Sequence, residues 1–260
     1  MKKNNTITMI RYTFFILLLT LSFPSFGQDN AETIFKKASE KLFLTNMEMT
    51  INIKETGKNK QVKEKTFHVL MAKFGMVEKT KTVIQKPIRA EGVTIVITKN
   101  PKKSGLIEIF TPANGKIRKL KATPQNMDRV GASSPISNYT SMDTNELYVK
   151  LIGKQQLDDK PNYLIMVTEK KDTTGSKAEF LIDEKSFRIL QIVSYDSSGN
   201  KSISNLSDFQ DISGYKGKVY PMHIVTKSMK DGEEKDIKVL SLTPRPDVKE
   251  EDFKILSAKN

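Results

Sequence analysis

Apolar and polar residues alternate with a period of two along most of the chain. In residues 47–54, MEMTINIK, every second side chain is apolar, so a β-strand formed by this segment has one apolar face and one polar face. Similar segments recur at intervals of about ten residues, with turn residues between them, and this spacing predicts an antiparallel meander. The segments predicted as strands are 47–54, 62–73, 76–85, 92–98, 106–110, 116–120, 147–152, 163–168, 177–183, 187–195, 201–209, 219–227 and 235–242.

One segment, residues 29–44, has the period of a helix instead. Asp29 and Glu32 are three residues apart, as in a capping box. Its apolar residues fall on one stripe, which consists of Ile34, Phe35, Ala38 and Leu42. Because the opposite side is rich in Lys and Glu, the stripe is expected to cover an apolar surface elsewhere in the fold.

These elements predict a mainly β (α+β) fold built on one sheet of roughly ten or eleven strands. A twisted sheet of that width curls or closes. We therefore expect a half-open, curled antiparallel β-barrel with helices packed on the concave face. Pro221 interrupts a predicted strand and indicates an edge or a bulge there.

The N-terminus has the pattern of an export signal. Lys2, Lys3 and Arg11 precede an apolar run at residues 12–23, and the small residues before position 28 suit a signal peptidase. We expect a signal peptide at residues 1–27, cleaved after Gly27, and a single domain at residues 28–260; an uncleaved anchor is the alternative. The sequence has no cysteine, which excludes an acylated N-terminal Cys and any disulfide. The expected location is the periplasm.

The chain is basic, with a formal net charge of +13. Such charge suits anionic head groups or acidic glycans, but lysines alternate with acids in KNKQVKEK and KDGEEKDIK, as on the solvated faces of hairpins. No recognition helix or aromatic RNA-binding motif is present, so nucleic acid is not an expected partner.

The sequence offers no set of residues for catalysis. His68 and His223 have no second ligand at metal spacing, and no GxSxG, P-loop or GxGxxG motif occurs. The Gly-Ser run that begins at Gly131 allows an anion cradle, although an ordinary loop has the same composition. We therefore predict no catalytic residues, no cofactor and no metal.

Methionine is the most informative residue type. Nine of the eleven methionines follow residue 27, and Met47, Met49, Met71 and Met166 lie in predicted strands. Methionine adapts to irregular apolar ligands, but it also fills ordinary cores. A curled sheet lined by Met, Ile and Val makes an acyl-chain pocket a credible hypothesis.

Several segments, taken in order, resemble the LolA-like family of outer-membrane lipoprotein-sorting proteins. They are IEIFTPANGKIRKL, GASSPISNYTSMDTNEL, PNYLIMVTEK, AEFLIDEKSFRILQIVSYDSSGN, YKGKVYPMHIVTKSMKDG and PDVKEEDFK. The loop GASSPISNY departs from the family pattern, and Pro135 stiffens it, so no ligand contact is transferred to it.

The resemblance implies a periplasmic carrier that holds lipid or lipoprotein acyl chains in a hydrophobic concave cavity and moves them toward the outer membrane. Its partners would include membrane-bound donor and acceptor proteins; the oligomeric state stays open. The candidate cavity residues are Ile34, Phe35, Ala38, Leu42, Met47, Met49, Ile51, Val69, Met71, Ile95 and Met166. Two alternatives are a signalling or envelope-stress module that binds a protein partner with a filled concave face, and a structural accessory domain.

Cleavage after Gly27 predicts that protein recovered from the periplasm of a Gram-negative host begins at Gln28. N-terminal sequencing and intact mass check this. Replacing Lys2 and Lys3 by Glu removes charge from the n-region and is expected to leave an unprocessed chain in the cytoplasm. A periplasmic protein that still carries Met1 would contradict the cleavage.

Overall fold

The computed structural model of the chain describes residues 30–100, 103–131 and 136–255. The chain divides into two compact units, Met1–Asn30 and Ala31–Asn260, and the following description concerns the second. The predicted signal peptide and the capping residue Asp29 lie outside the described residues. Within them, no helix combines the length and the apolar character needed to cross a membrane.

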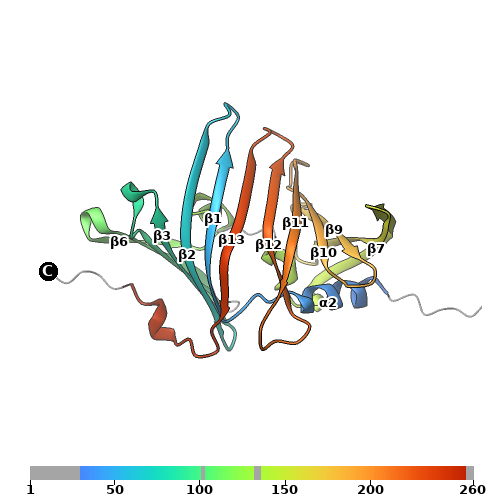
Figure 1. Cartoon of the computed structure of the whole chain (residues 1–260), viewed down its shortest axis with the longest axis horizontal. Coiled ribbons are helices and arrows are strands. Elements are labelled where there is room, and N and C mark those ends of the chain that lie inside the picture. The colour runs from blue at the N-terminus through green and yellow to red at the C-terminus, as the bar shows by residue number, and fades with distance from the viewer. Residues whose placement is uncertain (1–29, 101–102, 132–135, 256–260) are drawn as a thin grey trace, which may run out of the picture. The chain divides into compact units, whose positions relative to one another are not determined.

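One antiparallel sheet forms most of the second unit (Figure 1). Its strands are β1 (Met47–Thr56), β2 (Val62–Phe74), β3 (Val77–Lys86), β4 (Thr94–Asn100), β5 (Lys103–Thr111), β6 (Lys116–Lys121), β7 (Leu147–Leu157), β8 (Lys160–Glu169), β9 (Lys177–Asp183), β10 (Ile189–Tyr195), β11 (Lys201–Asp211), β12 (Val219–Ser228) and β13 (Glu234–Pro244). Their order across the sheet is β6-β5-β4-β3-β2-β1-β13-β12-β11-β10-β9-β8-β7. The chain thus builds two meanders, and β1 and β13 join them in the middle.

Helical segments are short and few in the described part of the chain. They are α2 (Ala31–Lys41), α3 (Pro124–Arg129), α4 (Ser137–Thr140) and the 3-10 turns η1 (Ile88–Ala90), η2 (Pro112–Asn114), η3 (Thr144–Glu146) and η4 (Glu250–Phe253). After α2, Phe43 donates a backbone hydrogen bond of 3.0 Å to the carbonyl of Val219, which ties the end of the helix to β12.

The predicted fold class is confirmed: the sheet is antiparallel, curled and unclosed, and it carries few helices. The predicted number of strands was wrong, because the sheet formed by the described residues has thirteen strands rather than ten or eleven. Each segment with period-two alternation forms its own strand, since turns separate all of them and none merges with its neighbour.

The apolar stripe of α2 covers the half of the sheet that contains β7–β12. Ile34 and Phe35 have no exposed surface, and the Phe35 ring meets the edge of the Phe180 ring at a centroid distance of 5.0 Å. Tyr139 of α4 packs on Phe180 as well, at 6.2 Å. This half of the inner face is a filled core, and we call it the helix core.

The C-terminal segment after β13 covers the outer face of β2–β4. Phe253 of η4 is 3% exposed and packs edge to face against Phe74 at 5.8 Å. Val248 joins the same cluster with Leu70 and Val96. In Figure 1 this segment, in red, leaves the end of β13 and passes toward β3. The outer face of these strands is therefore buried under the chain's own end.

Pro221 lies in β12, a strand in the interior of the sheet. Pairing of β12 with β13 ends at His223 and Lys238, so Pro221 is paired only with β11, through Phe209. Proline has no backbone N–H group to donate to a neighbouring strand. At Pro221 no donor to β13 is needed, because β12 and β13 are no longer paired at this point. The strand is not at the edge of the sheet, but the residue occupies a local edge.

We expect Ile34→Ala to lower the free energy of unfolding by about 3 kcal/mol, because it leaves a cavity in the helix core. Ile88→Ala removes the same atoms from a side chain that is 85% exposed, and we expect a change within about 0.5 kcal/mol. Urea unfolding followed by circular dichroism measures both. Equal effects of the two variants would contradict the packing of α2 on the sheet.

Candidate functional site

Strands β1–β4 turn two rows of side chains toward the inner face. Strand register aligns Met47, Met71, Thr80 and Ile97 in the first row. It aligns Met49, Val69, Thr82 and Ile95 in the second row. The members of a row share a face because directly paired residues on antiparallel strands do so. Each row contains one hydroxyl and three apolar side chains.

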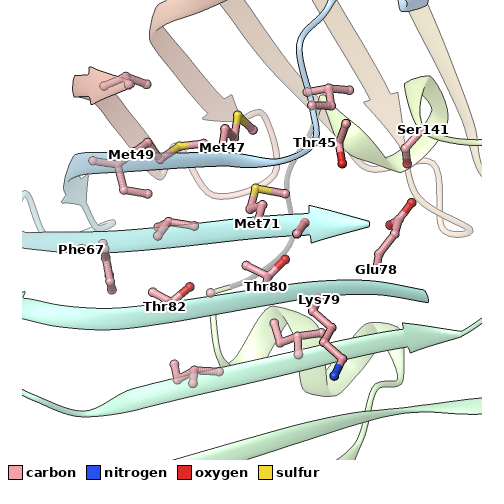
Figure 2. A pocket seen from close by; sticks show the side chains of 18 of the residues that line it. Thr45, Met47, Met49, Phe67, Met71, Glu78, Lys79, Thr80, Thr82 and Ser141 are labelled. Carbon is pink, nitrogen blue, oxygen red and sulfur yellow. The ribbon is translucent and has the colours of Figure 1, made fainter. Parts of the chain in front are cut away.

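A cavity of about 220 Å³ lies over these rows. Leu44, Tyr220 and Val239 contribute to its walls, and Met127 and Val130 from the α3 region line it from above the sheet. Figure 2 shows the sulfur-bearing side chains of Met47, Met49 and Met71 gathered on one side of this space. The helix core does not extend over these strands, so this half of the inner face keeps open volume.

One end of the cavity is polar. Thr45, Glu78 and Ser141 lie together there (Figure 2). The Lys73 ammonium is 3.8 Å from a carboxylate oxygen of Glu78, and Lys99 is the register partner of Glu78 on β4. The other lining residues along β1 and β2, toward Ile53 and Phe67, are apolar.

Six of the predicted cavity residues come together at this site. All six lie on β1, β2 or β4 and line the cavity: Met47, Met49, Ile51, Val69, Met71 and Ile95. Four of them are buried although they border open volume, and Ile51 and Met71 are half-buried.

The structure separates the other five predicted residues from the cavity. The stripe of Ile34, Phe35, Ala38 and Leu42 lies in the helix core, where β7–β12 leave no space beside it. Met166 on β8 alternates with Ile165 and Val167, which face that core, so it points to the opposite side of the sheet. The predicted sandwich of helix stripe and methionine rows does not form, because they occupy different halves of the inner face.

Several lining residues had no signal in the sequence. Thr80 and Thr82 sit in EKTKT, which is polar at every position and therefore shows no period of two. Tyr220 reaches the cavity from β12, far away in sequence, and burial raises the pKa of its hydroxyl to about 12. Only the pairing of β1 with β13 brings Tyr220 and Val239 beside Met49.

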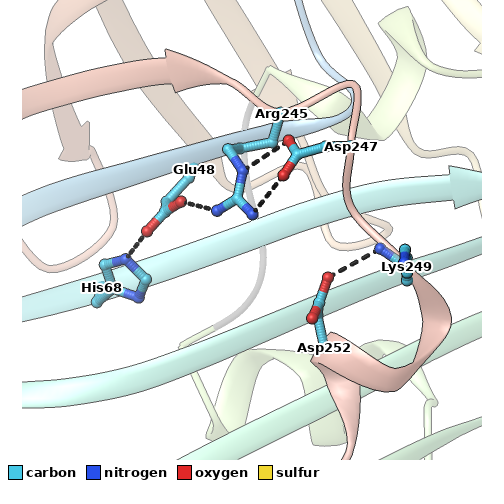
Figure 3. Close-up of polar contacts among 6 residues, drawn as sticks. All are labelled: Glu48, His68, Arg245, Asp247, Lys249 and Asp252. Atoms are coloured by element: carbon cyan, nitrogen blue, oxygen red, sulfur yellow. Dashed lines mark hydrogen bonds and ion pairs between the residues drawn. The ribbon is translucent and has the colours of Figure 1, made fainter.

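A cluster of charged side chains links β1, β2 and the segment after β13 on the face of the sheet opposite the cavity (Figure 3). Arg245, just after β13, holds Asp247 through Nε and Nη2 at 2.9 and 3.1 Å, and its Nη1 donates to Glu48 on β1. The other Glu48 oxygen is 2.6 Å from Nε2 of His68 on β2. Burial by itself would raise the pKa of Glu48, but the hydrogen bonds from Arg245 and His68 outweigh it and hold this pKa below its usual 4.5.

Both histidines have carboxylate partners on neighbouring strands. His68 contacts Glu48, and Nε2 of His223 is 2.8 Å from an Asp236 oxygen on β13. Among residues 30–100, 103–131 and 136–255, no three His, Asp or Glu side chains cluster as a metal site would require. Of the Gly-Ser run in the loop, only Gly131 falls within the described ranges, and it borders the cavity.

A family model with the description "Uncharacterized protein" matches residues 77–256, more than half of the chain. The chain belongs to this family. No curated protein matches it by sequence. Residues 77–256 include β3 to β13 and the C-terminal segment, so the match covers most of the sheet described above.

Solved structures show the fold to be LolA-like. A domain from Vibrio parahaemolyticus assigned to outer membrane lipoprotein sorting has a TM-score of 0.71 at 11% identity, over 86% of this chain and 95% of that one. A DUF1329 family protein from Desulfovibrio piger also has 0.71, at 16% identity over 87% and 98%. A LolA superfamily protein from Nitrosomonas europaea has 0.64, at 18% identity over 87% and 98%. The family resemblance seen in the sequence is confirmed at the level of the LolA-like fold.

The cluster behind the cavity predicts how stability depends on pH. We expect Glu48→Gln to lower the free energy of unfolding at pH 7 by about 1 kcal/mol, as for a half-exposed ion pair. Because the folded pKa of Glu48 is lowered, the wild-type advantage is complete above pH 4.5 and disappears as the pH falls through the folded pKa.

Chemical unfolding of both proteins between pH 7 and pH 3 measures this difference. Glu91→Gln, which changes an exposed glutamate on another part of the LolA-like unit, should match the wild type throughout. A difference between Glu48→Gln and the wild type that stayed constant down to pH 3 would contradict the assignment.

Proposed function

We propose that this LolA-like protein is a periplasmic carrier that binds the acyl chains of lipids or lipoproteins. The observation that supports this best is the open cavity over the two methionine-containing rows of β1–β4. An enclosed apolar surface with few convergent polar groups is typical of sites for lipid-like ligands. The inner wall includes three methionines, whose side chains adjust to chains of different shape.

Burial of hydrocarbon supplies sufficient binding energy for this role. Each methylene removed from water contributes about 0.8 kcal/mol, so ten methylenes contribute about 8 kcal/mol. The loss of translational freedom and the ordering of the chain offset part of this sum. A sum of about 8 kcal/mol by itself corresponds to a dissociation constant of about 1 μM, so micromolar binding requires a chain longer than ten methylenes once these costs are subtracted.

In the proposed role the protein takes up its ligand at the inner membrane and carries it toward the outer membrane. Membrane-bound donor and acceptor proteins are the proposed partners, and cleavage of residues 1–27 would free the carrier in the periplasm. Neither catalysis nor a cofactor is part of the proposal. The acyl chain enters between the α3 region and the inner face of β1–β4.

The open half of the inner face favours a carrier over a module that only binds a protein partner. Such a module requires no cavity, and the sequence-based version of that hypothesis expected a filled concave face. Only the half under α2 is filled, while β1–β4 border the cavity.

We expect Met71→Arg to weaken binding of a fluorescent long-chain fatty acid at least about tenfold, because it places a charge in the apolar wall. Met76→Arg makes the same change at a side chain that is 54% exposed, in the turn between β2 and β3, and should bind like the wild type. Fluorescence titration of delipidated protein gives the affinities.

Met71→Trp provides a second test, because it fills the cavity without adding charge. Circular dichroism confirms that each variant is folded before titration. Mass spectrometry of an organic extract from natively purified wild type should detect a co-purifying acyl lipid. Absence of any such lipid, together with no uptake of the fluorescent fatty acid by the wild type, would refute the carrier function.

A further inference from the structure

The inner face of β3 is polar where the strands on both sides are apolar. Its inward residues are Glu78, Thr80 and Thr82, and all three line the cavity. The two threonines each interrupt a row whose other members are Met, Val or Ile. A β-branched apolar residue would fit the same positions on a strand, so packing alone does not require the hydroxyls.

The hydroxyls of Thr80 and Thr82 make no hydrogen bond to any residue in the described part of the chain. A ligand that covered either hydroxyl without offering it a hydrogen-bond partner would lose about 1–3 kcal/mol. Each can donate one hydrogen bond into the cavity. These two groups are thus available to whatever occupies the space.

Polarity decreases along β3 from the polar end of the cavity toward Phe67. At the polar end, Glu78 lies between Lys73 and Lys99. Thr80 follows about 7 Å further along the strand, and Thr82 about 7 Å beyond it. Farther in, the lining is apolar at Phe67. A molecule with a charged head, a carbonyl linkage and a hydrocarbon tail presents the same order of groups.

We infer that the hydroxyl of Thr80 or of Thr82, which lie about 7 Å apart along β3, donates a hydrogen bond to the carbonyl oxygen that links a bound acyl chain to its head group. The ligand class is then an acyl ester or acyl amide with a charged head at Lys73, Glu78 and Lys99. The threonines make the cavity selective for acyl over alkyl chains. This inference rests on the proposed acyl-chain binding and adds the linkage chemistry that the site recognises.

Three probes of equal chain length test the inference by isothermal titration below their micellar concentrations. 1-Palmitoyl-lysophosphatidylglycerol carries an ester carbonyl, N-palmitoylglycine carries an amide carbonyl, and 1-O-hexadecyl-lysophosphatidylglycerol has an ether without a carbonyl. The wild type should bind the ester probe about two- to tenfold more tightly than the ether probe. The double variant Thr80→Val/Thr82→Val keeps the branched shapes and should lose this preference while binding the ether probe at least as well.

Thr98→Val is the matched control, because Thr98 alternates with Ile97 on β4 and faces away from the cavity. It should keep the wild-type preference. Weaker binding of the double variant to the ester probe, the amide probe or both supports the inference and identifies the linkage.

Equal wild-type affinities for ester and ether, together with unchanged binding of all probes by the folded double variant, would overturn the inference and leave the carrier function standing. A wild type that takes up none of the probes would overturn both.

Discussion

A curled sheet of thirteen strands has an apolar inner face that must be covered, and this requirement organises the whole unit. The eleven residues of α2 span about 16 Å, whereas thirteen strands at about 4.8 Å extend over about 60 Å. The helix therefore covers only part of the sheet. It packs on β7–β12 through Phe35 and Phe180, and the inner face of β1–β4 receives only the thin cover of α3. The cavity exists because the helices are too short to cover the whole inner face of the sheet.

The two faces of β1–β4 contrast in rigidity. Outside, Arg245 joins Glu48 to Asp247, and Phe253 packs on Phe74. Inside, flexible methionine side chains border open volume. The backbone of the cavity wall is thus held from behind, while its lining can adapt to a ligand. In the proposed carrier function, such a surface accepts acyl chains of varied length without movement of the strands themselves.

The LolA-like fold alone leaves several functions possible, since one fold hosts many sites. The distribution of polar and apolar residues within the cavity is the feature on which the proposed function depends. The charged end of the cavity, the two hydroxyls on β3 and the apolar lining beyond them form a gradient along one strand. In the proposed carrier function, this gradient sets the orientation of a bound amphiphile.

Local alternation predicted the strand segments, the helix and its buried stripe, because those properties depend on residues a few positions apart. Three outcomes depended on contacts between distant segments. The stripe of α2 lies on β7–β12 and not on the methionine rows, since Phe35 packs against Phe180, which is far away in the sequence. The face of Met166 was ambiguous because the run around it is apolar on both sides. Thr80 and Thr82 carried no periodic signal at all. The sequence by itself determined which segments form strands and which stripe of the helix is buried. Only the tertiary structure decided how distant strands pair and which half of the sheet stays open, because the open half depends on where one short helix packs.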